Sequence, residues 1–302
     1  MRSNGASERI AGGEGRDPHP QAKNGQRNGG SGPGRLSIVS LGPGSRNYLA
    51  PEALQALALA QVVVGYRTYL ELITDLTEGK RILASGMRKE VQRCQAAIDH
   101  ALAGYRVALV SSGDAGIYGM AGLVFDICRA RNLSVRRANP TAEVQGDDDG
   151  AMDFALDVIP GVAAFNAAAS LLGAPLMHDF AAISLSDHLT PWEIIEKRLV
   201  AVASADFVVA LYNPRSKTRP DLLDEARGLL LRYRSPDTPV GIVWRAMRIG
   251  QFQIITTLAE IPMEEVDMQS ILIVGNSQTY IWNGWMVTPR GYMEKYSVNS
   301  PV

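Results

Sequence analysis

Two glycine-containing segments carry the residue types best suited to hold a small ligand. Gly42-Pro43-Gly44 follows the apolar run 36–41, and Ser111 to Gly119, which contains Asp114, follows the apolar run 107–110. Glycine lets a ligand approach the main chain closely, and a carboxylate accepts hydrogen bonds from hydroxyls or binds a cation. We therefore predict a ligand site built mostly from backbone groups. Asp114 either contacts that ligand or caps the helix that follows it.

Two later segments add to this set. Pro160 to Ala164 has small side chains that leave room for a ligand, and Leu211 to Ser216 places an amide, a guanidinium and a hydroxyl after a buried strand. A dinucleotide fingerprint would require a third glycine at position 47, where the chain has Asn47, and no phosphate-binding G-x-x-x-x-G-K-[ST] motif occurs. A nicotinamide-dependent oxidoreductase is thus an alternative that this mismatch weakens.

Apolar runs of strand length alternate with segments of helical period from residue 35 onward. This rhythm predicts parallel sheets flanked by helices, with partly antiparallel strands late in the chain. We expect two α/β domains with a ligand-binding cleft between them. The predicted division is a disordered extension over 1–34, a first domain over 35–137, an interdomain loop over 138–157 and a second domain over 158–302.

Composition excludes several classes of protein. The 30 basic and 31 acidic residues of this 302-residue chain give a net charge of −1, which argues against nucleic acid as a partner. No apolar run approaches the roughly 20 residues of a membrane helix, so no membrane partner is expected. With only two cysteines, the chain suits the reducing cytoplasm better than an oxidising compartment.

No metal held by the protein is predicted. Asp147, Asp148 and Asp149 are consecutive, so their side chains point in different directions, which favours a solvated loop over a metal site. His178 and His188 are ten residues apart, which is not the spacing of a helical zinc pair.

The four segments G-P-G, S-G-D-x-x-x-Y-G, P-G-V-x-A and L-Y-N-P-R-S occur in the order that resembles the tetrapyrrole (cobalamin-pathway) methyltransferases. Within that family, the segments 64–69, 176–183 and 184–187 are similar to the members that methylate C17 of precorrin-3B. The resemblance covers residues 35–274. It implies a tetrapyrrole methyltransferase-like fold, S-adenosylmethionine as methyl donor, a tetrapyrrole (precorrin) substrate and a homodimer.

The resemblance also implies a donor site. Its residues would be Pro43, Ser112, Gly113, Asp114, Ile117, Ala163, Ala164, Asn213 and Ala246. Many relatives have Thr or Ser where this chain has Ala163, so a side-chain hydroxyl contact would be replaced here by backbone or water.

A macrocycle bearing several carboxylates requires guanidinium groups, which bind carboxylates through two parallel hydrogen bonds. Five arginines lie at or just beyond predicted strand ends, and we expect at least two to face the substrate: Arg46, Arg67, Arg215, Arg245 and Arg248. Tyr66 is a further substrate candidate. The ring contraction that the resemblance implies needs proton transfer, for which the candidates are Ser186, Asp187, His178 and Tyr66.

The function expected from this resemblance is methylation of C17 of precorrin-3B, with ring contraction to precorrin-4. The cobalt-containing counterpart, cobalt-factor III, is an alternative acceptor. A non-catalytic tetrapyrrole carrier with the same cleft would bind the macrocycle without binding or consuming the methyl donor.

Overall fold

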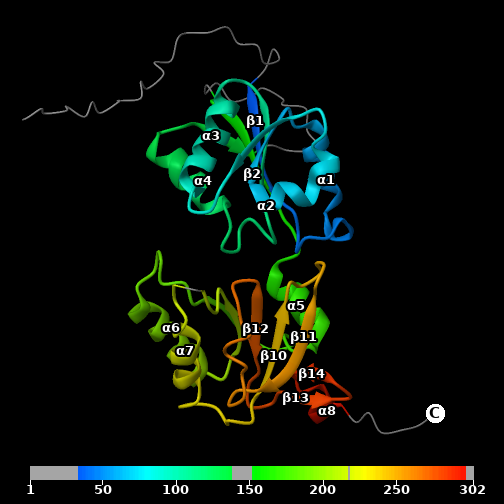
Figure 1. Ribbon diagram of the computed structural model, residues 1–302, viewed down its shortest axis with the longest axis vertical. Helices are drawn as coiled ribbons and strands as arrows, with labels where there is room; N and C mark the ends of the chain where they lie inside the picture. Colours follow the sequence, from blue (N-terminus) through cyan, green and yellow to red (C-terminus); the bar gives the residue numbers. More distant parts are fainter. Residues whose placement is uncertain (1–32, 138–151, 217, 297–302) are drawn as a thin grey trace, which may run out of the picture.

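The computed structural model describes residues 33–137, 152–216 and 218–296, which form two lobes stacked along the long axis of the molecule (Figure 1). The predicted extension over 1–34 therefore lies almost wholly outside the described residues, as does most of the predicted 138–157 loop.

The N-terminal lobe is built on a parallel sheet in the order β3-β2-β4-β1-β6-β5. Its strands are β1 (Gly34–Ser40), β2 (Val62–Tyr66), β3 (Arg81–Ser85), β4 (Arg106–Ser111), β5 (Val135–Arg137) and β6 (Phe154–Ile159). The helices between them are η1 (Arg46–Tyr48), α1 (Pro51–Leu59), α2 (Arg67–Leu70), η2 (Glu71–Leu76), α3 (Glu90–Leu102) and α4 (Ala121–Ala130).

Strand β1 shows why this sheet is buried on both faces. Leu36 and Ile38 pack in one apolar cluster with α3 and α4, whereas Val39 and Leu41 pack in a second cluster with α1. Successive strand residues point to opposite faces, so a nearly continuous apolar run serves two helical layers.

The C-terminal lobe contains a five-stranded sheet in the order β11-β10-β12-β9-β8. Only β8 and β9 of this sheet pair in parallel, which confirms the expected mixed character. The elements are α5 (Ala164–Leu172), β8 (Phe180–Ser184), α6 (Trp192–Ser204), β9 (Val208–Tyr212), α7 (Leu222–Leu230), β10 (Pro239–Trp244), β11 (Phe252–Thr257) and β12 (Ser270–Val274).

Helices cover both faces of the second sheet. Helices α6 and α7 pack on one face, and α5 packs on the other. Helix α5 lies so close that a Cβ atom at Gly241 of β10 would stand 2.3 Å from Leu172 Cδ1. A small three-stranded sheet, β13-β14-β7, and a short helix follow: β7 (Gly173–Ala174), β13 (Tyr280–Trp282), β14 (Trp285–Val287) and α8 (Tyr292–Lys295).

The predicted domain boundary needs correction. Residues 154–157 were expected in an interdomain loop and 158–159 in the second domain, but together they form β6, which pairs with β1 and β5 of the first sheet. Strand β6 is therefore the last described segment of the N-terminal lobe, and the chain crosses to the C-terminal lobe between Ile159 and Ala164.

Among the described residues, every helix is too short or too polar to serve as a membrane span.

Candidate functional site at the junction of the lobes

Three of the predicted ligand loops meet because β4, β1 and β6 are neighbours in one parallel sheet. Parallel strands end at the same edge, where open α/β sheets bind their ligands. The loops after β1 and β4 are joined directly: Gly42 N donates to Gly113 O at 3.0 Å, and Gly113 N donates to Gly42 O at 2.6 Å. Both glycines have φ of +66°, a backbone conformation that other residues rarely adopt.

Asp114 ties the third loop to this pair. Its Oδ2 accepts a hydrogen bond from Gly161 N at 3.0 Å, and its Oδ1 accepts one from Gly116 N at 2.8 Å. Helix α4 begins only at Ala121, so the alternative in which Asp114 caps that helix is wrong. The carboxylate instead fixes the loop after β4 against the loop after β6.

Gly161 is the point of closest approach between these loops. A Cβ atom there would lie 2.6 Å from Ser40 Cβ and 2.7 Å from Gly113 O. Any side chain would push the three loops apart, so the site depends on glycine at this position.

Residues of both lobes then close around the loops. Ile117 of the N-terminal lobe and Ala246 of the C-terminal lobe belong to one apolar cluster with Ala163 and Ala164, at the start of α5. A Cβ atom at Gly113 would lie 3.7 Å from Ala164 N. The structure thus brings most of the predicted donor residues together, although they come from four separate segments.

Two tyrosines join the lobes beside this cluster. The Tyr118 hydroxyl donates to Ala182 O of β8 at 2.9 Å, and its ring lies 5.0 Å from the ring of Tyr212, centroid to centroid. The Tyr212 hydroxyl accepts a hydrogen bond from Phe165 N, in the first turn of α5, at 3.1 Å. Burial raises the pKa of Tyr212 to about 12, so this hydroxyl stays protonated at neutral pH.

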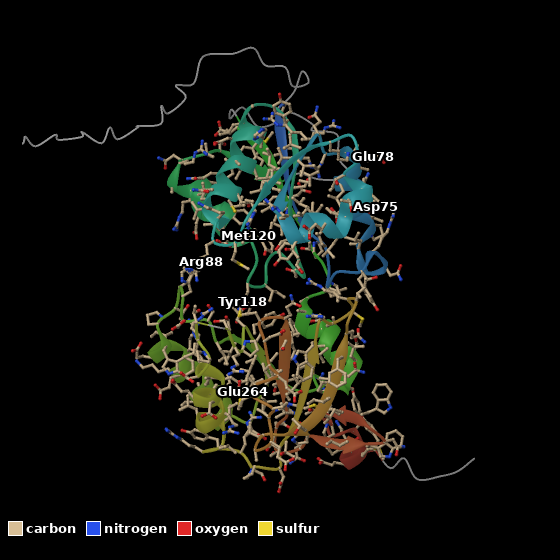
Figure 2. All side chains as sticks on the ribbon, in the orientation of Figure 1. Asp75, Glu78, Arg88, Tyr118, Met120 and Glu264 are labelled. Atoms are coloured by element: carbon tan, nitrogen blue, oxygen red, sulfur yellow. The ribbon has the colours of Figure 1, made fainter. Side chains whose placement is uncertain are left out.

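Figure 2 shows Tyr118 with Arg88 and Met120 at the end of the N-terminal lobe that faces the C-terminal lobe. Tyr118 has φ of +54°, which is uncommon for a bulky side chain and is typical of functional sites.

A polar group lies at the ends of β8 and β9. Asn213 Nδ2 donates to Ser184 Oγ at 2.9 Å, and Ser186 N donates to the same oxygen at 3.2 Å. Arg219 Nη1 donates to Ser186 Oγ at 2.5 Å and to Asp187 Oδ1 at 3.0 Å. Asn213, Ser186 and Asp187 were predicted site residues, and the structure places them in one network.

His178 does not join this group. It precedes β8, whereas Ser186 and Asp187 follow the strand, and the four steps from Phe180 to Ser184 span roughly 13 Å. His178 is 47% exposed, and its Nδ1 accepts a hydrogen bond from Asp179 N at 2.8 Å. This geometry separates His178 from Ser186 and Asp187, two of the other candidates for proton transfer.

Three of the predicted substrate arginines form hydrogen bonds or ion pairs within their own lobe. Arg215 donates to Met263 O at 2.8 Å and to Glu264 Oε2 at 2.8 Å, and Figure 2 shows Glu264 well down the C-terminal lobe, away from the junction. Arg245 donates to Gln269 Oε1 at 2.8 Å, and Arg46 pairs with Asp75.

Tyr66 and Arg67 lie where β2 ends and α2 begins. Tyr66 is held by Arg93, whose guanidinium carbon stands 5.8 Å from the centroid of its ring, while Arg67 is exposed. Arg93 itself is buried and donates to Ser85 Oγ at 2.7 Å and to Gly86 O at 2.9 Å, at the end of β3.

Arg248 behaves differently from the other arginines. From the turn after β10, it donates through Nε to Pro43 O and through Nη2 to Ser112 Oγ at 2.6 Å, so it contacts both predicted donor loops of the opposite lobe. Burial lowers the pKa of its guanidinium, although the group stays charged at neutral pH.

The sequence interpretation did not include Tyr118 or Arg219 among the site residues. Tyr118 follows the nominated Ile117 and lay inside the glycine-rich segment. Arg219 lies in a turn in which its N donates to Ser216 O at 3.0 Å, and this turn returns Arg219 toward Ser186 and Asp187. The N-P-R-S segment at 213–216 is a turn signal. A chain reversal there would have favoured Arg219 over Arg215 as the arginine of the site.

Among the described residues, no three His, Cys, Asp or Glu side chains are grouped in a way that could hold a metal ion.

Comparison with known proteins agrees with this arrangement. The model of the Tetrapyrrole (Corrin/Porphyrin) Methylases matches residues 35–140 and 141–262. The chain belongs to this family. The family membership confirms the predicted fold class, two α/β domains of the tetrapyrrole methyltransferase type.

Curated members of the tetrapyrrole methylases are similar over most of the chain. A probable cobalt-factor III C(17)-methyltransferase of Salmonella typhimurium is 50% identical over 85% of this chain and 99% of its own length. A precorrin-3B C(17)-methyltransferase of Sinorhizobium sp is 40% identical over 82% of this chain and 91% of its own length. A cobalt-factor III methyltransferase of Priestia megaterium is 46% identical over 88% of this chain, which spans only 46% of that relative.

Among solved structures, the methyltransferase CobJ superimposes with a TM-score of 0.75 at 35% identity, over 85% of this chain and 100% of CobJ. A uroporphyrin-III C-methyltransferase of Thermus thermophilus, complexed with S-adenosyl homocysteine, shares the fold with a TM-score of 0.56 at 20% identity, over 80% of this chain and 97% of that one. The predicted enzyme class is confirmed: the chain is a methyltransferase of cobalamin biosynthesis.

Proposed function

We propose that this tetrapyrrole methylase transfers a methyl group from S-adenosylmethionine to C17 of precorrin-3B, with ring contraction to precorrin-4. The observation that carries the proposal is the meeting of three loops, at the ends of β1, β4 and β6, with the start of α5 and the turn after β10. That meeting brings together residues of both lobes that the sequence analysis predicted for the donor site.

The residues present suit the methyl donor. Ala163, Ala164 and Ala246 have small side chains, and Ile117 packs against the same cluster, so these residues offer an apolar surface for a nucleoside. Asp114 supplies a negative charge within reach of a cationic ligand. Alanine at position 163 has no hydroxyl to offer, so the polar contacts of the donor would fall to backbone groups of the loops.

The donor, when bound, supplies an activated methyl group on a positively charged sulfur. The protein residues mainly have to align that methyl with the acceptor carbon, and such alignment can itself contribute several kcal/mol to catalysis. The tie between Asp114 and Gly161 and the contacts of Tyr118 and Tyr212 hold the donor loops in one geometry.

The acceptor would be recognised through its carboxylates. Arg67 directly follows β2, Arg219 contacts Ser186 and Asp187 after β8, and Arg93 lies against the Tyr66 ring. In the contraction step, Ser186 and Asp187 are the residues placed to hold or move a proton, since they share a hydrogen-bond donor in Arg219.

The homodimer and the cytoplasmic location belong to the same proposal. The family resemblance supports the dimer, and both cysteines, Cys94 and Cys128, are free and buried, which suits a reducing compartment. Sedimentation of the purified 32.6 kDa chain at twice its mass would support the dimer, and sedimentation as a single chain would contradict it.

Cobalt-factor III is a second candidate acceptor, and one observation favours it. The relative with that printed substrate is 50% identical to this chain, whereas the precorrin-3B relative is 40% identical. In that case cobalt would arrive within the substrate.

The test is incubation of the purified protein with isotopically labelled S-adenosylmethionine and each macrocycle in turn, followed by mass spectrometry. A gain of one labelled methyl group on precorrin-3B supports the proposal, and a gain only on cobalt-factor III selects the second candidate. Binding of a macrocycle with no donor binding or consumption would identify a carrier, and oxidation of a nicotinamide would identify an oxidoreductase.

A further inference from the structure

Arg248 stands on a hydrogen-bonded turn. Its main-chain N–H donates to Arg245 O at 2.9 Å, and its carbonyl accepts from Gln251 N at 3.0 Å. The Gln251 side chain also accepts from Met247 N at 2.8 Å. Arg245 and Met247 have positive φ, so the turn is tightly specified, and it aims the Arg248 side chain at the opposite lobe.

The Arg248 guanidinium donates hydrogen bonds to both donor loops but, among the described residues, to no carboxylate. Its partners are Pro43 O and Ser112 Oγ, and among the described residues it forms no ion pair and Nη1 makes no hydrogen bond. The side chain is half-buried, and a Cβ atom at Gly44 would lie 2.5 Å from Nε. A partly desolvated cation without a counter-charge is unfavourable, so the position is suited to an anionic ligand group.

The groups around Arg248 indicate which ligand that is. Tyr69 lies close enough to Arg248 to interact electrostatically, and its ring stands 5.1 Å from the ring of Tyr66, a predicted substrate residue. Arg248 thus lies between the donor loops on one side and the predicted acceptor side on the other.

We propose that Arg248 couples the two substrates: its Nη1 donates a hydrogen bond to a carboxylate of the tetrapyrrole, while its Nε and Nη2 hold the donor loops at Pro43 and Ser112. This inference rests on the proposed function. The carboxylate neutralises the guanidinium, and the cationic donor then binds beside a neutral pair instead of beside a positive charge.

The coupling depends on the charge of the donor. S-adenosylmethionine carries a sulfonium, and sinefungin, an unreactive analogue, carries an ammonium at the same place. S-adenosylhomocysteine has a neutral sulfur there. Unit charges roughly 10 Å apart at an effective dielectric constant of about 20 to 40 change affinity by about 3- to 20-fold. The acceptor should therefore strengthen sinefungin binding by that factor and S-adenosylhomocysteine binding much less.

The test is titration calorimetry of both analogues, with and without the tetrapyrrole, on the wild type, Arg248→Gln and Arg248→Met. Without the tetrapyrrole, we expect the affinity for sinefungin relative to that for S-adenosylhomocysteine to be about 3- to 20-fold higher in Arg248→Gln and Arg248→Met than in the wild type. In these two variants, adding the tetrapyrrole should no longer strengthen sinefungin binding. Arg129→Gln removes an exposed cation of α4, paired with Asp126 at 3.7 Å, and should leave both ratios unchanged.

Two failures are distinguishable. If the wild type binds neither analogue, the proposed function is wrong, and this inference falls with it. If the wild type binds both analogues but both neutral variants show the same affinity ratios as the wild type, the proposed function stands and the coupling role of Arg248 is overturned. Retained S-adenosylhomocysteine binding in a variant shows that the variant is folded.

Discussion

At the scale of single residues, Asp114 has a structural duty as well as an expected ligand contact. Its two carboxylate oxygens each accept a backbone N–H, from Gly116 and from Gly161, so the same group that would face the donor also joins two loops. Hydrogen bonds to charged groups contribute about 1.5–3 kcal/mol each to stability.

Asp114→Asn should therefore weaken both donor binding and folding. The amide has one acceptor oxygen in place of two, so one backbone N–H loses its partner, and we expect the free energy of unfolding to fall by about 1–3 kcal/mol. Urea denaturation and donor titration check this. Asp126→Asn, at an exposed ion pair on α4, is the control and should change neither quantity. An unchanged unfolding free energy in Asp114→Asn would contradict the assigned role.

Tyr212 makes the free energy of unfolding depend on pH in the alkaline range. Its pKa is raised from 10.0 to about 12, mainly by burial, so below pH 10 both the folded and the unfolded chain keep the proton and its contribution is complete. Between pH 10 and 12 the unfolded chain loses the proton first, so the contribution declines as the pH rises.

The wild type should lose unfolding free energy more steeply over pH 10–12 than Tyr212→Phe does. The difference between the two curves isolates Tyr212 from Cys94, whose pKa burial also raises to about 12. Urea denaturation across this pH range measures both curves, and parallel curves would show that Tyr212 is not responsible.

At the scale of elements, the site depends on how closely three strand ends can approach. A Cβ atom added at Gly161 would clash with Ser40 Cβ and Gly113 O. A Cβ atom added at Gly122, within α4, would meet open space. The same substitution should thus have opposite effects at the two positions.

Gly161→Ala should lower the free energy of unfolding by about 1–3 kcal/mol, the usual cost of overpacking, and should weaken donor binding as well. Gly122→Ala should raise the free energy of unfolding by up to about 1 kcal/mol, because alanine favours the helix, and should leave donor binding unchanged. Thermal unfolding with donor titration measures both. Equal effects of the two variants would show that the loops are not in tight contact.

At the scale of the whole molecule, each lobe has apolar clusters of its own. The lobes meet at the cluster that Ile117 joins and through contacts such as those of Tyr118 and Arg248. The chain provides separate reporters for the lobes. Both cysteines, Cys94 and Cys128, lie in the N-terminal lobe, and all four tryptophans lie in the C-terminal lobe.

Without ligand, thiol labelling and tryptophan fluorescence should give different urea midpoints. S-adenosylhomocysteine contacts both lobes in our proposal, so at a hundredfold excess over its dissociation constant it should stabilise the folded chain by about 2.7 kcal/mol and bring the midpoints together. Midpoints that stay separate with the ligand bound would place the ligand on one lobe alone.

Local sequence determined the family, the four ligand loops and most of the elements. Glycine and proline after apolar runs mark strand ends wherever the strands later lie, and this is why Gly42, Gly113 and Gly161 could be nominated in advance. The apolar run of β1 likewise predicts a strand buried on both faces.

The tertiary structure alone decided which side chains reach the junction of the lobes. Strand order is a long-range property, so β6 joined β1 although the chain between β5 and β6 favoured a domain boundary. Side-chain direction depends on turn geometry: the positive φ angles around Arg248 send it across to Ser112, while Arg215 bonds its own lobe and Arg219 reaches Asp187. Periodicity carries neither kind of information, because it records which residues are apolar and not where one strand lies against another.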